Sequence, residues 1–157
     1  MAKIRLIWPG KTKESWLKQG IDHFLKRLKN YYQVNVVETR AAKYSAANKD
    51  KAAQQESVQI LKALEKKRGV VVVLDLSGRQ MSSEELAAFI KNRQDMGMAA
   101  FDFVIGGAYG FSPEVIKKAD LLLSLSKMTF THEMARLILV EQLYRAASIN
   151  VGSPYHH

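Results

Sequence analysis

The chain of 157 residues has the length of one domain. Its composition, 47% hydrophobic and 25% charged, is that of a globular protein and excludes a disordered chain. The absence of cysteine excludes disulfide scaffolds, thiolate zinc sites and cysteine nucleophiles. No apolar run approaches the ~20 residues of a membrane helix, and the N-terminal apolar stretch is too brief for a secretory signal. We therefore expect a cytoplasmic protein with one domain over residues 1–157 and no membrane contact.

The charge is unevenly distributed along the chain. Lys and Arg number 24 against 15 Asp and Glu, which gives a formal net charge of +9. Residues 1–68 contain 16 basic and 6 acidic side chains, whereas residues 69–157 contain 8 and 9. A concentrated positive charge is typical of proteins that bind a polyanion such as nucleic acid. A basic surface can also serve solubility alone, so charge favours nucleic acid only slightly.

The first part of the chain alternates between strand and helix patterns. Residues 3–8 are predicted to form a strand that Pro9-Gly10 closes with turn chemistry. Residues 14–30 place their apolar side chains on one face at helical spacing, and residues 33–38 are predicted as a second strand. The polar, alanine-rich segment 40–51 is interpreted as an exposed loop before a helix over residues 50–67.

The second part continues the alternation. The β-branched run 70–76 predicts a strand buried on both faces. Ser82-Ser-Glu-Glu85 matches a capping box that starts a helix, and Gly97 ends it. Residues 101–105 are a predicted strand, and Ser112-Pro113-Glu114 predicts a helix start with a capping hydroxyl. A fifth strand over 121–125, a loop, a helix over 131–148 and a short tail complete the chain.

This alternation with short connections predicts a single doubly wound α/β domain, with a mainly parallel sheet and helices on both faces. Ligand sites in such sheets form beyond the carboxyl ends of the strands. The segments that follow Leu74, Ile105 and Leu125 are therefore the candidate site.

Two of these segments contain residues that could contact a ligand. Gly106-Gly107-Ala-Tyr-Gly110 would let the backbone approach a ligand closely, but it matches neither the dinucleotide fingerprint nor a phosphate-binding loop. A tight turn explains it equally well. In the segment 126–133, Met128 and Phe130 could contact a flat ring. From chemistry alone, a capping loop whose Met and Phe fill the core is slightly favoured.

The C-terminal region offers further polar residues. Glu141 and Arg145 lie four apart on the last predicted helix, and an exposed ion pair worth a few tenths of a kcal/mol is the better interpretation without further context. The ending Tyr155-His156-His157 is expected to be mobile or a purification-tag remnant. The four histidines match no zinc pattern, so no metal is predicted.

Four segments, taken together, resemble one known family over essentially the whole chain. They are Phe103-Val-Ile-Gly-Gly107 with Gly110, Leu123-Ser-Leu-Ser-Lys-Met-Thr-Phe130 with His132, Glu141-Gln-Leu-Tyr-Arg-Ala146, and the final Tyr155-His156. This combination is similar to the large-subunit ribosomal RNA methyltransferase H family, which methylates N3 of a pseudouridine in 23S ribosomal RNA. The resemblance implies the SPOUT class, with a deep C-terminal trefoil knot that binds S-adenosylmethionine. It also implies a homodimer with a shared active site, acting on 23S rRNA within the assembled ribosome.

The resemblance assigns roles by position. The methyl donor would contact two strand ends and one loop, namely Leu74, Gly106, Leu125, Ser126, Lys127, Met128, Thr129 and Phe130. Catalysis or RNA contact would fall to Glu141, Arg145, Tyr155 and His156, which makes the terminal Tyr-His native. Thr131 departs from several relatives that carry proline there, and we expect it to loosen the helix entry.

A mechanism follows as a hypothesis. Arg145 is the first candidate to stabilise the negative charge that develops on the base, and His156 or Glu141 could accept the proton. The alternatives are a non-catalytic RNA-binding or ribosome-assembly protein, which would bind no methyl donor, and a nucleotide-binding regulator. The regulator is disfavoured because the chain has no phosphate-loop lysine or magnesium-binding pattern.

Overall fold

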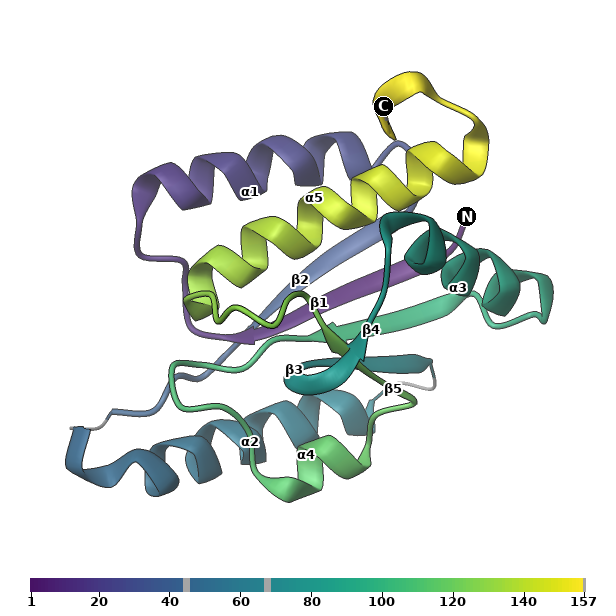
Figure 1. Ribbon diagram of the computed structural model, residues 1–157. Coiled ribbons are helices and arrows are strands. Elements are labelled where there is room, and N and C mark those ends of the chain that lie inside the picture. Colours follow the sequence, from purple (N-terminus) through teal and green to yellow (C-terminus); the bar gives the residue numbers. More distant parts are fainter. Residues whose placement is uncertain (44–45, 67–68, 157) are drawn as a thin grey trace.

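The computed structural model describes residues 1–43, 46–66 and 69–156, which alternate between strands and helices (Figure 1). The strands are β1 (Lys3–Pro9), β2 (Gln33–Thr39), β3 (Val70–Gln80), β4 (Ala100–Val104) and β5 (Leu121–Ser124). The α-helices are α1 (Ser15–Leu28), α2 (Lys49–Glu65), α3 (Ser83–Asp95), α4 (Pro113–Lys117) and α5 (His132–Val151). Two short 3-10 helices, η1 (Ala46–Asn48) and η2 (Pro154–His156), complete the described secondary structure.

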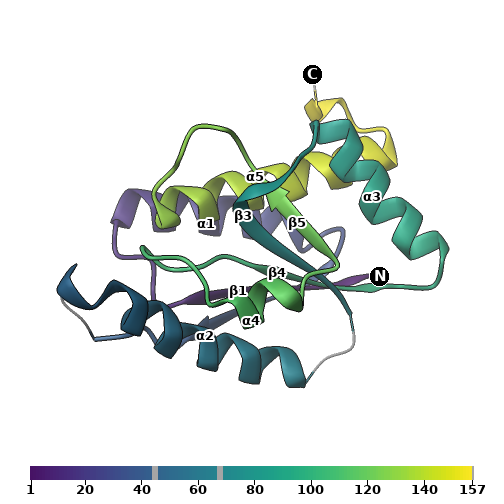
Figure 2. The same ribbon diagram turned by 60° about the horizontal axis from the view of Figure 1, so that its bottom comes forward.

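The five strands form one sheet in the order β2-β1-β4-β3-β5, and every neighbouring pair is parallel. Helices α1, α3 and α5 cover one face, and α2 and α4 cover the other (Figures 1 and 2). Each face has its own apolar cluster. The larger one contains Phe101 and Phe103, and the smaller one contains Ile7 and Val104. The predicted doubly wound α/β fold is confirmed, with a sheet that is wholly parallel.

A buried ion pair joins the two central strands. Arg5 on β1 donates from Nε and Nη2 to the two carboxylate oxygens of Asp102 on β4, at 2.8 and 2.9 Å. Both residues are buried, and Arg5 also donates to the Ala63 carbonyl on α2. Arg5, one of the basic residues of the first half of the chain, is therefore paired inside the protein and is not part of a basic surface.

Several predicted boundaries need correction. The Ser82 capping box is present with both of its hydrogen bonds, but the Ser112 hydroxyl makes no cap hydrogen bond and α4 has only five residues. Helix α5 runs three residues beyond its predicted end, and Gly152 stops it with a φ of +74°. The tail was expected to be mobile, yet η2 packs against α5. Lys67, the expected end of the second helix, and His157 lie outside the described residues.

Strand β3 is longer than predicted because it contains an irregularity. It pairs with β5 at Leu74↔Leu123 and again at Arg79↔Leu123, so the residues between bulge out of the ladder. After the bulge, β3 passes so close to β5 that a Cβ on Gly78 would lie 2.7 Å from the Leu122 carbonyl carbon. Only a residue without a side chain fits this crossing.

In the described part of the chain, no helix combines the length and apolar character needed to span a bilayer.

We predict that Gly78→Ala destabilises the protein by more than about 2 kcal/mol, because the new Cβ would meet the β5 backbone rather than a mobile side chain. Chemical denaturation measures the change. Gly97→Ala is the comparison, since Gly97 has a φ of +84° but nothing within 4 Å of its Cβ position. That variant should lose only the roughly 1–2 kcal/mol of left-handed backbone strain. Equal losses would contradict the crowding argument.

Candidate active site

The bulge of β3 and the carboxyl ends of its neighbours β4 and β5 surround one pocket of about 670 Å³. Its walls come from residues 74–76 at the bulge of β3, most of 105–111 after β4, most of 123–132 at the end of β5 and beyond it, and Ala135 on α5. The loops after β4 and β5 extend from the same end of the sheet (Figure 2). Neighbouring parallel strands bring their carboxyl ends to one edge, so the sheet order itself assembles the pocket. A volume of this size suits a small-molecule ligand.

Seven of the eight residues predicted to contact a cofactor line this pocket. They are Leu74, Gly106, Leu125, Ser126, Met128, Thr129 and Phe130. Lys127, the eighth, is exposed and does not line it. Sequence reasoning missed Asp75, Phe111 and His132, which also line it. Asp75 follows directly on Leu74, Phe111 lies in the loop after β4, and His132 starts α5, so their place in the chain was the available signal.

Local hydrogen bonds shape the loop after β5. The Ser124 hydroxyl donates to the Ser126 carbonyl at 3.0 Å, and the Ser126 hydroxyl accepts from the Met128 N–H at 2.9 Å. The Thr131 hydroxyl accepts from the Met134 N–H at 3.1 Å and caps α5, so Thr131 secures the helix entry rather than loosening it. Met128 is 73% exposed, which contradicts the interpretation that this residue fills the core.

Two buried charges fix the start of α5, and with it one wall of the pocket. The Glu133 carboxylate accepts from two N–H groups of segment 9–14 at 2.9 and 3.1 Å. The fully buried Arg136 guanidinium donates to two carbonyls of the same segment at 2.7 and 3.2 Å and to the Thr12 hydroxyl at 3.0 Å. Because His132 and Ala135 belong to the same helix turns, these bonds position pocket residues.

A third buried charge lies behind the glycine loop. Glu56 on α2 is 5% exposed, and its Oε2 accepts from the Ala42 N–H at 3.1 Å. Its Oε1 is so close to Gly107 that a Cβ there would lie 2.4 Å away. Burial raises the pKa of the Glu56 carboxyl, while the Ala42 hydrogen bond and the charge of Arg136 oppose that rise.

The polar residues predicted at the C-terminus form a second cluster. Arg145 donates from Nε and Nη2 to Glu141 Oε1 at 3.1 and 2.6 Å, and the Tyr155 hydroxyl donates to the same oxygen at 3.2 Å. The Arg145 guanidinium lies 5.0 Å from the centre of the Tyr155 ring. The hydrogen bond to Glu141 raises the pKa of Arg145, which keeps it cationic. These side chains are about a quarter exposed or less, so the pair is part of a cluster rather than an isolated surface pair.

This cluster does not reach the pocket of the same chain. Arg145 lies ten positions along α5 from Ala135, in the pocket wall, which is about 15 Å at 1.5 Å per residue. Figure 1 shows α5 running from the loop edge of the sheet to the end beside the C-terminus. His156 ends η2, and its side chain lies outside the described part.

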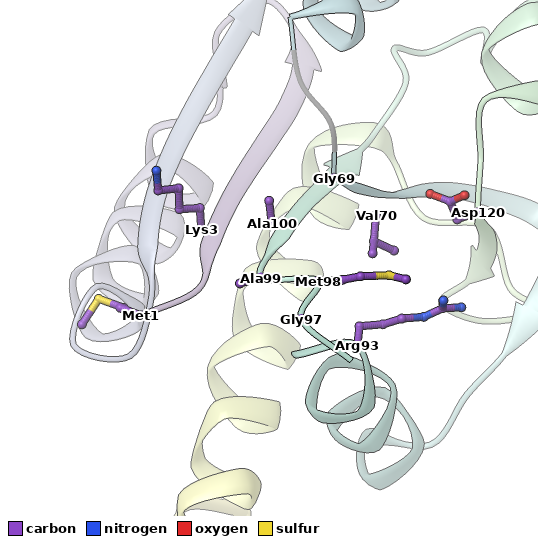
Figure 3. A pocket seen from close by; sticks show the side chains of 10 residues that line it. All are labelled: Met1, Lys3, Gly69, Val70, Arg93, Gly97, Met98, Ala99, Ala100 and Asp120. Atoms are coloured by element: carbon purple, nitrogen blue, oxygen red, sulfur yellow. The ribbon is translucent and has the colours of Figure 1, made fainter. Parts of the chain in front are cut away.

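A second hollow of about 670 Å³ lies at the opposite, amino edge of the sheet. Arg93 and Met98 extend side by side toward Asp120, whereas Lys3 and Met1 stand on the other side of residues 99–100 (Figure 3). The rule for parallel sheets places ligand sites at the carboxyl edge, so this hollow is not the candidate site. Within the described residues, no three His, Asp or Glu side chains gather closely enough to hold a metal ion.

Comparisons with known proteins identify the family of the chain. A family model described as "Predicted SPOUT methyltransferase" matches residues 2–156. The chain is 43% identical over 155 residues to the ribosomal RNA large subunit methyltransferase H of Geobacter metallireducens, covering 99% of both chains. It is 46% identical over 158 residues to the protein of the same name from Halothermothrix orenii, covering 98% of this chain and 99% of that one.

Solved structures share the fold at low sequence identity. A probable methylase family protein from Haemophilus influenzae matches with a TM-score of 0.55 and 15% identity, covering 97% of this chain and 70% of that one. TrmJ from Z. mobilis matches with a TM-score of 0.53 and 11% identity, covering 93% and 70%. A chain from Legionella pneumophila, solved in complex with SAM, matches at 0.50 with 16% identity, covering 92% and 66%.

We predict that Glu56→Gln stabilises the protein increasingly as the pH rises from 4 to 8. A carboxyl whose folded pKa is raised contributes stability below its ordinary pKa, and that contribution is lost as the pH rises through the raised value. Glutamine stays neutral and can still accept from the Ala42 N–H. Calorimetry should show a higher Tm for the variant than for the wild type at pH 8, and a difference that shrinks as the pH falls to 4. A difference that does not change with pH would contradict this electrostatic origin.

Proposed function

The chain belongs to the SPOUT methyltransferase family, and on that premise we propose that it transfers a methyl group from S-adenosylmethionine to N3 of a pseudouridine in 23S ribosomal RNA. The observation that carries the proposal is the pocket at the bulge of β3 and the ends of β4 and β5, lined by seven of the eight residues that the resemblance assigns to the donor. The curated relatives named above are large-subunit ribosomal RNA methyltransferases and match the full length of the chain.

The pocket fits the proposed donor in size and in wall chemistry. Gly106 leaves room beside the Phe111 ring that a side chain would fill, and Leu74, Leu125 and Phe130 supply apolar surface for a flat ring. The similar chain from Legionella pneumophila, solved in complex with SAM, supports the same choice of ligand. When bound, S-adenosylmethionine supplies a methyl group on a positively charged sulfur that is already a strong electrophile. The protein therefore has mainly to position the two reactants. We propose that it does so without a metal ion.

We propose that the active site is shared in a homodimer. The pocket lies at the start of α5, and Arg145 of the Glu141–Arg145–Tyr155 cluster lies about 15 Å farther along that helix, too far to act on one base within one chain. A second copy that places its cluster against this pocket would complete the site. The face of α5 next to α1 supports such a contact, because Trp16 is 57% exposed and Leu137 and Ile138 are only partly covered.

Within the cluster, the hydrogen bonds distinguish the proposed roles. Arg145 stays cationic and can stabilise the negative charge that develops on the base as its N3 is methylated. Both oxygens of Glu141 already accept hydrogen bonds, from Arg145 and Tyr155 on one side and from Gln142 on the other. A carboxylate held this way is a poor proton acceptor, so we propose His156 as the general base and Glu141 as the group that positions Arg145.

Three further points complete the proposal. The exposed lysines and arginines of the first half would bind RNA phosphates, with the assembled ribosome in the cytoplasm as the substrate.

The crossing of β3 over β5 at Gly78 supports a trefoil knot in the C-terminal half. A non-catalytic RNA-binding protein is the alternative, and it is disfavoured because nothing in that role requires an open pocket at the glycine loop.

Gly106→Leu should abolish S-adenosylmethionine binding in calorimetric titration while leaving a cooperative thermal transition. A Cβ at this position already lies 3.1 Å from the Phe111 ring, so a larger side chain has to occupy the pocket. Gly106→Ala is the graded control and should weaken binding about tenfold or less, because the Phe111 ring can shift. Unchanged affinity in Gly106→Leu would remove this pocket as the donor site.

Arg145→Ala should lower kcat by about 10²-fold or more with donor affinity nearly unchanged, because Arg145 stands outside the pocket of its own chain. Mixing this variant with Gly106→Leu tests the shared site. Each homodimer should be inactive, but a heterodimer contains one pocket and one cluster that are both intact and face each other. Recovery of up to about a quarter of wild-type activity is expected from random mixing. No recovery after subunit exchange would show that each chain uses its own cluster.

A further inference from the structure

The charge lining the donor pocket is unusual for a chain with a net charge of +9. Among the described residues that line it, Asp75 carries a carboxylate and none is Lys or Arg. Lys127, in the middle of the loop after β5, is exposed and does not line the pocket. His132 also lines it, but burial and the charge of Arg136 lower its pKa, so it adds no positive charge at neutral pH.

Glu56 adds a second negative charge directly behind the wall. Its buried carboxylate touches Gly107, whose backbone lines the pocket. Because Gly107 has no Cβ, no side chain of its own stands between the Glu56 carboxylate and the loop backbone that lines the pocket. In a protein interior of low dielectric, a charge at that position acts strongly on a bound ligand.

Neither carboxylate is neutralised by a direct ion pair with another described residue. Asp75 accepts from the N–H and the hydroxyl of Ser77, which are neutral donors. The nearest buried cation acting on Glu56 is Arg136, but its guanidinium donates to carbonyls and a hydroxyl of the segment after β1. Arg136 also acts on Glu133 and Glu38, so one cation is shared among three carboxylates.

We infer that Glu56 and Asp75 are specificity-determining residues that shift binding in this pocket toward ligands with a positive charge. The inference rests on the proposed function and deepens it. S-adenosylmethionine carries a sulfonium cation, whereas S-adenosylhomocysteine, which remains after methyl transfer, has a neutral thioether. The two ligands differ by one charge and one methyl group. The two carboxylates therefore stabilise the donor more than the product, which helps the product to leave.

The experiment compares affinities for three probes, S-adenosylmethionine, S-adenosylhomocysteine and sinefungin, by calorimetric titration at pH 7.5. Sinefungin carries an amine in place of the sulfonium methyl, and so it is cationic but cannot transfer a methyl group. The variants are Glu56→Gln and Asp75→Asn, which keep size and hydrogen-bond acceptance. Glu65→Gln, exposed on the same helix as Glu56, and Asp120→Asn, at the opposite edge of the sheet, are the matched controls.

We expect each pocket variant to reduce the preference for S-adenosylmethionine over S-adenosylhomocysteine by about three- to tenfold. The preference for sinefungin over S-adenosylhomocysteine should fall in parallel. The controls should change it less than about twofold. If the two carboxylates had a purely structural role, the variants would weaken the binding of all three probes alike and leave the affinity ratios unchanged. That result would overturn the inference. Binding of none of the probes by the wild type would instead contradict the proposed function, and the inference with it. The two variants report independently, so one that fails to fold leaves the other decisive.

Discussion

Everything in the proposed site depends on β4, β3 and β5 being neighbours in one parallel sheet. This order brings three strand ends to one edge, where each chain reversal contributes a wall of the pocket. The bulge in β3 then moves Asp75 and Leu76 out of the ladder and toward the ligand space. Gly78 allows the strand to return against β5. The pocket thus follows from the order of the strands and from the way β3 crosses β5.

Buried charges hold this edge together. Glu133 and Arg136 bind the start of α5 to the segment after β1, and Glu56 supports the glycine loop from α2. Burying such groups is unfavourable unless polar partners compensate. Here loop backbone groups bind all three side chains, although the Nε of Arg136 has no hydrogen-bond partner among the described residues. Helix α5 consequently has two tasks along its length, since its first turn is part of the pocket and its last turns carry Arg145. Because the pocket and Arg145 lie at different positions along α5, we propose that a single chain does not form a complete active site.

Much of the fold could be predicted from the sequence, because apolar periodicity and capping patterns are local. The Ser82 capping box and the five strands are examples. The bulge in β3 and the packing of η2 on α5 could not be predicted, since each depends on contacts between distant segments. Arg136 looks like any helix-surface cation in the sequence, yet it is fully buried. Glu56 likewise gave no local signal of its place behind Gly107.

Hydrogen–deuterium exchange of the wild-type chain, with and without saturating S-adenosylmethionine, tests the central claim most directly. Our account predicts slower exchange in residues 74–76, 105–111 and 125–131, and no change at residues 97–100 on the amino edge of the sheet. Protection confined to the amino edge, or no protection of the three loops at a ligand concentration that saturates binding, would contradict it.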